Sequence, residues 1–186
     1  YGVLGRWPVW VDGSARGMLD TYSKYGVLFE ENKQKMLRKV FNNDMRDRLS
    51  IVQNHEPCVI IAPSGMLNGG WSPFYAKHLV ANSKNLIALT CYQIRSLPGH
   101  HLLKARVGSR ICFNDNRRSV ATVRAKVRQF NFSSHAQAKD LVSLVERMNP
   151  KKGTFLIHGE VSAMRTLQDQ LPERNIQPTY VGEKIV

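Results

Sequence analysis

The stretch Asn131-Phe-Ser-Ser-His-Ala-Gln-Ala-Lys-Asp-Leu-Val-Ser-Leu-Val-Glu-Arg-Met-Asn-Pro-Lys-Lys-Gly-Thr-Phe-Leu-Ile-His-Gly-Glu160 decides the fold that the sequence predicts. A histidine follows an extended apolar run at each end, His135 after residues 127–132 and His158 after residues 153–157. Between them an amphipathic helix is predicted, and Pro150 ends it because proline lacks the N–H and disfavours helix in the residue before it. The apolar positions at helical spacing are Ala138, Leu141, Val142, Leu144, Val145 and Met148.

The predicted unit is therefore strand–helix–strand, and its two histidines are candidate site residues. If the two strands pair in parallel, their carboxyl ends lie at one edge of a sheet, where ligands sit in open α/β sheets. His135 and His158 would then meet at that edge. The alternative is a surface or capping role for each, which is the commoner role of a lone histidine after a strand. Spacing alone specifies neither a metal nor a reaction.

The composition indicates a basic globular chain. Its 186 residues are 42% hydrophobic, enough for one ordinary domain or two small ones with a buried core. Lys and Arg number 27 against 14 Asp and Glu, and the net charge of +13 favours a polyanion, most commonly nucleic acid. A solubility charge, or a basic face that covers an acidic partner subunit, would give the same composition. No apolar run is long enough for a membrane span, and no signal peptide is found.

The three cysteines are Cys58, Cys91 and Cys112, each in an apolar context and far from the others. Because no CxxC pair exists, the sequence argues against a cysteine-based structural zinc site. We expect buried thiols in a reducing compartment, which places the chain in the cytoplasm, or in the nucleus of a eukaryote.

The first half of the chain predicts strands, helices and a glycine-rich loop. A strand over residues 9–11 precedes Asp12, which is interpreted as a helix cap rather than a site carboxylate. Residues 15–52 are predicted to be mostly helical, with a break at Gly26 and a second helix through Met36, Leu37, Val40 and Phe41. Residues 58–62 predict a strand buried on both faces of a parallel sheet.

The loop Ser64-Gly-Met-Leu-Asn-Gly-Gly70 follows this strand and precedes a helix through Phe74, Tyr75, His78 and Leu79. Its backbone N–H groups could hold an anion, although tight turns also need glycine. A second buried strand is predicted over residues 85–93 and a loop over residues 94–103. The adjacent His100 and His101 would point apart and not share a metal.

Residues 106–130 predict strands with two different faces. Alternation places Val123, Ala125 and Val127 on one face, and Arg124, Lys126 and Arg128 on the other. The basic ladder is either a solvated face or a surface that follows phosphates. After His158, a helix through Met164, Leu167 and Leu171 and an edge strand over residues 179–186 are expected.

Taken together, these stretches resemble the β-CASP branch of the metallo-β-lactamase superfamily, in particular cleavage and polyadenylation endonucleases. The matching motifs occur in the family's order over nearly the whole chain. They are Pro8-Val-Trp-Val-Asp-Gly-Ser14, Val59-Ile-Ile-Ala-Pro-Ser-Gly-Met-Leu-Asn-Gly-Gly70, Cys91-Tyr-Gln93 through Pro98-Gly-His-His-Leu-Leu103, Phe132-Ser-Ser-His135 and His158-Gly-Glu160. The fold class implied is α/β: a partial, parallel-sheet β-CASP cap over residues 1–103, then the C-terminal half of a metallo-β-lactamase αββα core over residues 104–186.

The resemblance also implies chemistry. His158 matches a ligand of one of two zinc ions, and His135 matches the histidine that helps to protonate the leaving oxygen of the cleaved phosphodiester. Ser64 and Gly65 would face the nucleic acid backbone, and Arg124, Lys126 and Arg128 are candidate phosphate contacts. The implied function is hydrolysis of RNA, or of single-stranded DNA, by a zinc-dependent nuclease in RNA processing or decay.

The sequence departs from the family pattern at several positions. The main metal cluster, His-x-His-x-Asp-His, is absent, as are the other ligands that precede the cap. Gln137 replaces a carboxylate, Cys91 a glycine and His100 an arginine. We therefore expect the catalytic half in cis before Tyr1 or on a partner chain, with zinc bound at most partially here. The alternative is a non-catalytic nucleic-acid-binding or scaffold subunit. A half-core would also expose a sheet face, which predicts pairing with another chain or a homo-oligomer.

Overall fold

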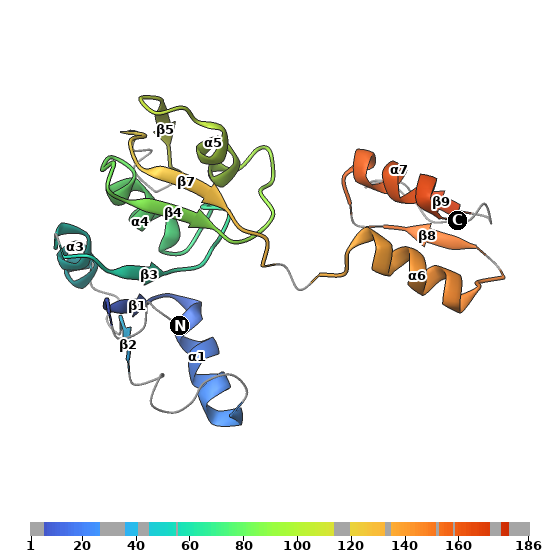
Figure 1. Ribbon diagram of the computed structural model, residues 1–186, viewed down its shortest axis with the longest axis horizontal. Helices are drawn as coiled ribbons and strands as arrows, with labels where there is room; N and C mark the ends of the chain where they lie inside the picture. The colour runs from blue at the N-terminus through green and yellow to red at the C-terminus, as the bar shows by residue number, and fades with distance from the viewer. Residues whose placement is uncertain are drawn as a thin grey trace. The chain divides into compact units, whose positions relative to one another are not determined.

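The computed structural model describes residues 6–26, 36–40, 45–54, 56–113, 120–132, 135–151, 153–157, 159–171 and the backbone of 176–178. The chain forms two compact units, residues 1–133 and residues 134–186 (Figure 1). Of the helices in the described ranges, none is both long and apolar enough to cross a membrane.

The first unit begins with a parallel sheet in the order β2-β1-β3. Its strands are β1 (Val9–Val11), β2 (Leu37–Lys39) and β3 (Val59–Ile61). Helix α1 (Ser14–Tyr25) follows β1, and α3 (Met45–Gln53) lies between β2 and β3 in the sequence. The central strand β1 pairs in register with both neighbours, and its Val9 and Val11 are each only 3% exposed. This sheet matches the predicted strand at residues 9–11.

Two predictions for this sheet were wrong. Residues 37–39, predicted to lie in a helix through Met36 and Val40, form strand β2, and Phe41 lies outside the described residues. Pairing with β1 overrides the helical spacing, and the Val40 N–H extends it by donating to the Val11 carbonyl at 3.0 Å. The second correction concerns β3, which ends the strand order instead of being buried on both faces, and whose Ile61 is 47% exposed.

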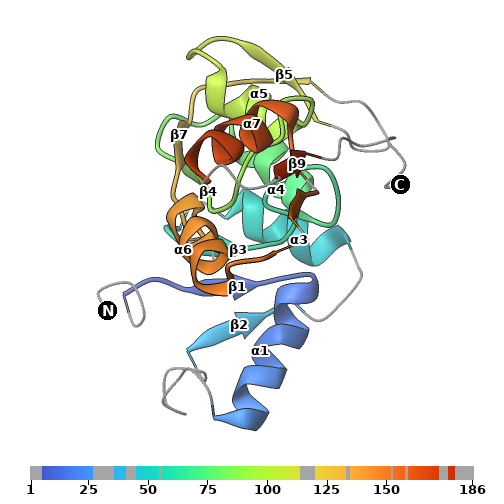
Figure 2. The ribbon, with the colours of Figure 1, turned by 90° about the vertical axis from the view of Figure 1, so that its right-hand side faces the viewer.

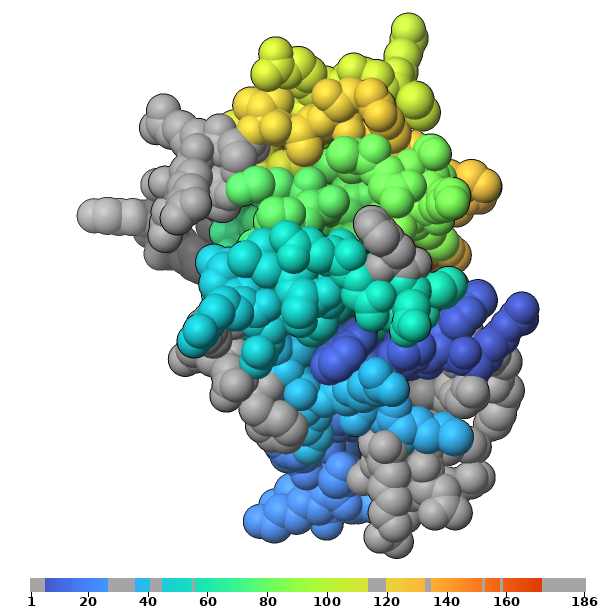
Figure 3. All heavy atoms as spheres, turned by 90° about the vertical axis from the view of Figure 1, so that its left-hand side faces the viewer, coloured from blue at the N-terminus to red at the C-terminus, as the bar shows by residue number. Residues whose placement is uncertain are grey.

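The remainder of the first unit encloses the larger hydrophobic core. Strands β4 (Leu86–Leu89) and β7 (Lys126–Gln129) pair in parallel, and β5 (Arg110–Cys112) and β6 (Val120–Thr122) form an antiparallel pair. Helices α4 (Ser72–Leu79) and α5 (Pro98–Lys104) complete it (Figure 2). The core residues are Leu67, Ala76, Val80, Leu89, Leu102, Ile111, Phe113, Val123 and Ala125. In Figure 3, the cyan α3 lies between the blue β1–β2 region and the green and yellow β4–β7 region.

Three details of this region differ from prediction. Residues 98–104, expected as a loop, form α5, which starts at a proline and buries Leu102 completely. Strand β4 is not buried throughout, because Leu86 is 55% exposed while Leu89 is 2% exposed. Cys112 is exposed, and Cys58 and Cys91 are only partly buried, so the expectation of three buried thiols was wrong.

The second unit contains α6 (Ala138–Met148), β8 (Thr154–Leu156), α7 (Val161–Gln170) and β9 (Ile176–Pro178). The two predicted helices are confirmed, and β8 pairs in parallel with β9. The predicted pairing across α6 was wrong: β7 pairs with β4 and β8 with β9, so the two strands belong to different sheets. The strand expected over residues 179–186 lies outside the described residues.

One buried ion pair connects β1, α3 and α4. Asp12, directly after β1, and Arg48 of α3 are both fully buried. The Arg48 Nε and Nη2 atoms donate to the two carboxylate oxygens of Asp12 at 2.7 and 2.8 Å. The Tyr75 hydroxyl of α4 also donates to Asp12 at 2.8 Å, and the Arg48 guanidinium carbon lies 3.6 Å from the Trp71 ring centroid. Asp12 is therefore the acceptor of a buried network, which corrects its interpretation as a helix cap.

This network sets the charge state of Asp12. Burial alone would raise the pKa of Asp12, but hydrogen bonds from Arg48, Tyr75 and the Gly13 N–H outweigh it and hold the pKa below its ordinary value. Burial and the Asp12 hydrogen bond raise the pKa of Tyr75, which stays a neutral donor. Because the folded-state pKa of Asp12 is depressed, its contribution to stability is complete above about pH 4 and is lost as the pH falls through the folded-state value.

We expect Asp12→Asn to lower the free energy of unfolding by about 3–5 kcal/mol, because it leaves the Arg48 charge buried without a partner. Urea unfolding followed by circular dichroism measures this change. The matched control is Asp20→Asn, which removes the ion pair between Lys39 and Asp20, whose side chain is 61% exposed. That control should cost less than about 1 kcal/mol. Equal losses for the two variants would contradict the structural role of the buried pair.

Candidate nucleic-acid interface

The glycine-rich loop predicted to hold an anion, residues 64–70, starts at the carboxyl edge of the first sheet. The Ser64 N–H donates to the Gly69 carbonyl at 3.5 Å, and the Leu67 N–H donates to the Ser64 carbonyl at 3.1 Å. The Ser64 hydroxyl donates to Asn68 Oδ1 at 2.8 Å, and the hydroxyl of Ser72 donates to the Ser64 carbonyl at 2.5 Å. Several polar groups of the loop are therefore already hydrogen-bonded within it or to Ser72, and these bonds fix the loop's geometry.

Gln93 attaches this loop to the segment that follows β4. Its side chain is 4% exposed, and its Nε2 donates to the carbonyls of Gly65 at 3.1 Å and Cys91 at 3.0 Å. The Gly99 N–H donates to the Met66 carbonyl at 3.0 Å. A Cβ atom at Gly99 would stand 2.0 Å from Gln93 Oε1 and 2.9 Å from the Met66 carbonyl oxygen. Only glycine therefore fits at position 99 without displacing the loop.

The same segment connects the loop to the end of β7. The Gln129 side-chain amide donates to the Cys91 carbonyl at 2.9 Å, and that carbonyl also accepts from Gln93. A chain of hydrogen bonds thus runs from Gly65 through Gln93 and Cys91 to Gln129. The structure brings together two regions that the sequence proposed separately as phosphate contacts, the Ser64–Gly65 turn and the strand that carries Lys126 and Arg128.

The basic ladder has the predicted alternation. Arg124, Lys126 and Arg128 are exposed, whereas Val123 and Ala125 are 1% and 3% exposed. The surrounding sequence is nearly free of acids, because residues 57–132 contain eleven Lys and Arg and a single carboxylate, Asp115. An unbalanced cationic face of this kind suits a polyanion. The roles of Ser64, Gly65 and the three ladder residues as phosphate contacts stay predictions.

Sequence reasoning named Phe132 as part of a family motif but did not single out Phe130 and Phe132 as an aromatic pair directly after β7. Their rings stack with centroids 6.0 Å apart and planes 17° apart, and their side chains are 38% and 74% exposed. The two phenylalanines stand two residues apart, and this spacing is the local signal that could have found the pair.

His135, predicted to be catalytic, and His158, predicted to bind zinc, have different outcomes. His135 is exposed and lies shortly before α6. His158 lies outside the described residues, so its predicted proximity to His135 stays a prediction. Gln137, in the family's carboxylate position, stands at the start of α6, where its N–H donates to Asp140 Oδ2 at 2.9 Å.

The residues present do not fit a zinc centre in the part of the chain that the structure describes. No group of three or more His, Cys, Asp or Glu side chains gathers there in a way that could hold a metal. His100 and His101, although their rings are in contact, belong to no such group.

Two family models match the chain. The first is the Beta-Casp domain, which matches residues 2–102. This chain belongs to the β-CASP family. The second is the Zn-dependent metallo-hydrolase RNA specificity domain, which matches residues 120–181. The predicted fold class is therefore confirmed: the chain is α/β, with parallel sheets in a β-CASP domain followed by a metallo-hydrolase RNA specificity domain, as in part of a metallo-β-lactamase fold.

The curated relatives are archaeal and plant proteins. Transcription termination factor FttA of Methanocaldococcus jannaschii is 28% identical over 187 residues, covering 94% of this chain and 30% of the relative. Cleavage and polyadenylation specificity factor subunit 3-II of Arabidopsis thaliana is 32% identical over 132 residues, covering 71% and 21%. RNase aCSPSF2 of Saccharolobus solfataricus is 29% identical over 172 residues, covering 90% and 32%. The chain thus spans about a fifth to a third of the length of these relatives.

The boundary between the two domains of this chain differs between the packing of the structure and the family models. By packing, β5, β6 and β7 belong to the first unit, which ends at Ser133. The second family model nevertheless starts at Val120. The boundary between residues 103 and 104, drawn from the sequence, stays a prediction about family domains and does not coincide with the packing division.

We expect Gly99→Ala to destabilise the first unit by about 1–3 kcal/mol, because the added methyl group overlaps Gln93 and the Met66 carbonyl. Thermal unfolding measures the loss. The matched control is Gly69→Ala in the same glycine-rich region, where a Cβ meets no atom within 4 Å. That variant should change the free energy of unfolding by less than about 0.5 kcal/mol. A neutral Gly99→Ala variant would contradict the close contact between α5 and the loop.

Proposed function

We propose that this chain is the RNA-holding part of a β-CASP nuclease that hydrolyses phosphodiester bonds during RNA processing or decay. The observation that carries the proposal is the cationic, nearly acid-free segment 57–132, in which Arg124, Lys126 and Arg128 are all exposed. The relatives include an RNase and a cleavage and polyadenylation specificity factor subunit, which supports RNA as the polyanion. A cytoplasmic site of action, or a nuclear one in a eukaryote, accompanies this proposal.

Catalysis in this proposal depends on groups beyond the described residues. The family's metal cluster does not occur in the sequence, and His158 alone among the candidate ligands matches a family zinc position. The catalytic half is proposed to come from the same longer polypeptide or from a partner chain. His135 is proposed as the residue that passes a proton to the leaving oxygen, because imidazole both binds and releases protons near neutral pH.

A second candidate function is an RNA-binding or scaffold subunit without hydrolysis. It is favoured by the absence of a metal-holding cluster within the described ranges. The two candidates share RNA binding and differ in whether RNA is cut. In both, exposed apolar side chains of the second unit, such as Phe155 and Ile157, suit a covering chain, either the missing half or a second copy.

Replacing the ladder cations, in Arg124→Gln/Lys126→Gln/Arg128→Gln, should weaken binding of single-stranded RNA and reduce its salt dependence. Three lost phosphate contacts lower the slope of log K against log salt concentration by about 2. Fluorescence anisotropy with a labelled RNA over a range of salt concentrations measures both effects.

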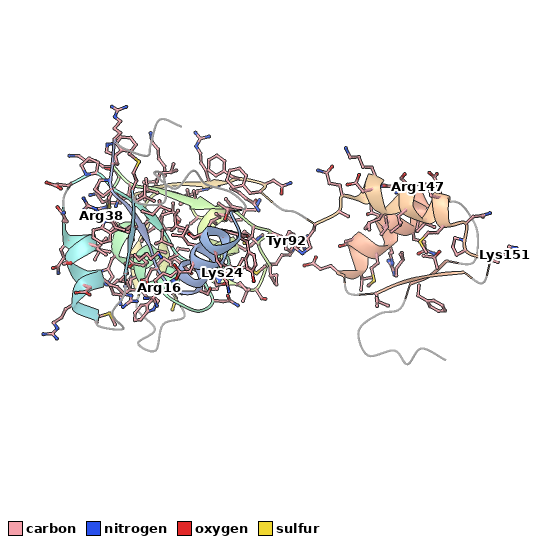
Figure 4. The ribbon with its side chains drawn as sticks, turned by 90° about the horizontal axis from the view of Figure 1, so that it is seen from below. Arg16, Lys24, Arg38, Tyr92, Arg147 and Lys151 are labelled. Carbon is pink, nitrogen blue, oxygen red and sulfur yellow. The ribbon has the colours of Figure 1, made fainter. Side chains whose placement is uncertain are left out.

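The matched control is Lys24→Gln/Arg38→Gln/Arg46→Gln, which removes the same number of charges from α1, β2 and α3. Lys24 and Arg38 are labelled in Figure 4. That control should change the slope by less than about 1. Equal slopes for the two triple variants would place the RNA elsewhere, and no RNA binding by the unmodified chain would refute the proposed function.

His135→Ala should slow RNA cleavage by about 10²–10⁴-fold when the chain is combined with its catalytic half in zinc, because general acid catalysis is lost. RNA affinity should stay within about twofold, so single-turnover cleavage of bound, end-labelled RNA isolates the chemical step. The control is His101→Ala, an exposed histidine of α5. Unchanged cleavage by the His135 variant would remove this residue from the reaction, and RNA binding without any cleavage would favour the scaffold candidate.

A further inference from the structure

Exposed cationic and aromatic side chains occur within β7 and directly beside it in the sequence. Lys126 and Arg128 lie in the strand, Arg124 precedes it with a bend at Ala125 between them, and Phe130 and Phe132 follow it. All five side chains are exposed. The end of the strand is held by the Phe130 N–H, which donates to the Leu89 carbonyl at 2.8 Å. We call these five residues the β7 stripe.

Strand β4, which pairs with β7, adds no carboxylate to this surface. Lys126 pairs in register with Leu86, and Arg128 pairs with Ala88. Leu86 is 55% exposed and Ala88 is also exposed, so small and apolar side chains flank the two cations. The stripe therefore combines a line of positive charge with apolar contact area, and the adjoining segments that the structure describes contribute no carboxylate to it.

The rings of Phe130 and Phe132 are arranged as a platform. The ring centroids are 6.0 Å apart and the planes differ by 17°, which is the geometry of two rings in direct contact. Its outer faces stay available, and the 74% exposure of Phe132 leaves the terminal ring open.

We propose that the β7 stripe is a binding site for single-stranded RNA, with phosphates along Arg124, Lys126 and Arg128 and unpaired bases stacked on Phe130 and Phe132. Cations that follow the backbone, beside aromatic rings that accept any base, are the combination by which proteins hold single strands without reading their sequence. An apolar protein partner would account for the two rings but not for three exposed cations among neighbours free of acids. A double helix would satisfy the cations but would hide its bases from the rings.

This inference rests on the proposed function and adds to it the recognition of unpaired bases.

The test compares an oligouridylate of about 12 nucleotides with the same sugar-phosphate backbone lacking bases, using anisotropy with the full 186-residue chain. The unmodified chain should prefer the base-bearing strand by about 5- to 150-fold, the range expected for one stacked base. Phe130→Leu/Phe132→Leu keeps the apolar area but removes the rings, and it should abolish most of this preference. Because no cation is lost, the salt dependence of binding should not change.

The matched control is Phe155→Leu, which replaces a 50% exposed phenylalanine of the second unit and should retain the full preference. Circular dichroism checks that each variant is folded, and the single variant Phe132→Leu replaces the double variant if the latter does not fold. A preference for bases that survives the loss of both rings overturns the inference while leaving the proposed function intact. Loss of self-association without any loss of base preference would identify an interface between copies and overturn it too. Failure of the unmodified chain to bind either strand refutes both proposals.

Discussion

The ion pair between Asp12 and Arg48 is the constraint on which the first unit depends. Neither side chain contacts solvent, so each charge is satisfied only when β1, α3 and the Tyr75 hydroxyl of α4 meet in this arrangement. A buried charge without a partner is strongly destabilising, and alternative packings of these elements are therefore disfavoured. Trp71, against which Arg48 packs, directly precedes α4 and links the ion pair to the glycine-rich loop.

Hydrogen bonds then transmit this fixed geometry to the candidate interface. The loop begins where β3 ends, and Gln93 holds its Gly65 carbonyl. The Cys91 carbonyl accepts from both Gln93 and Gln129, which joins the loop to the end of β7. The exposed side chains are thus presented by backbone with buried attachments, and a rigid support of this kind lowers the entropic cost of ordering a ligand on it.

The spacing of apolar residues was sufficient to predict those elements whose structure depends mainly on their own sequence. The helix through Val142 and Val145 was predicted because its apolar spacing is regular and Pro150 ends it. The alternation around Val123 and Arg124 was predicted for the same reason, because a strand with one buried face repeats every two residues.

Contacts between distant residues could not be predicted in this way. Arg48 follows Asp12 by 36 positions, and no local signal pairs them. Strand β2 is three residues long, and its pairing with β1 outweighs the helical spacing around Leu37. His135 and His158 were predicted as site residues because each follows an apolar run and because each matches a family motif, and the relatives named above are several times longer than this chain.

The scarcity of carboxylates in residues 57–132 has a consequence for how any bound polyanion would be released. The eleven Lys and Arg of the segment are offset by one carboxylate only, Asp115. Dissolved counterions are then the main competitors of a bound polyanion for these cations, and salt screens exposed charges beyond about 10 Å at 0.1 M. Ionic strength is therefore the variable that loosens such a complex.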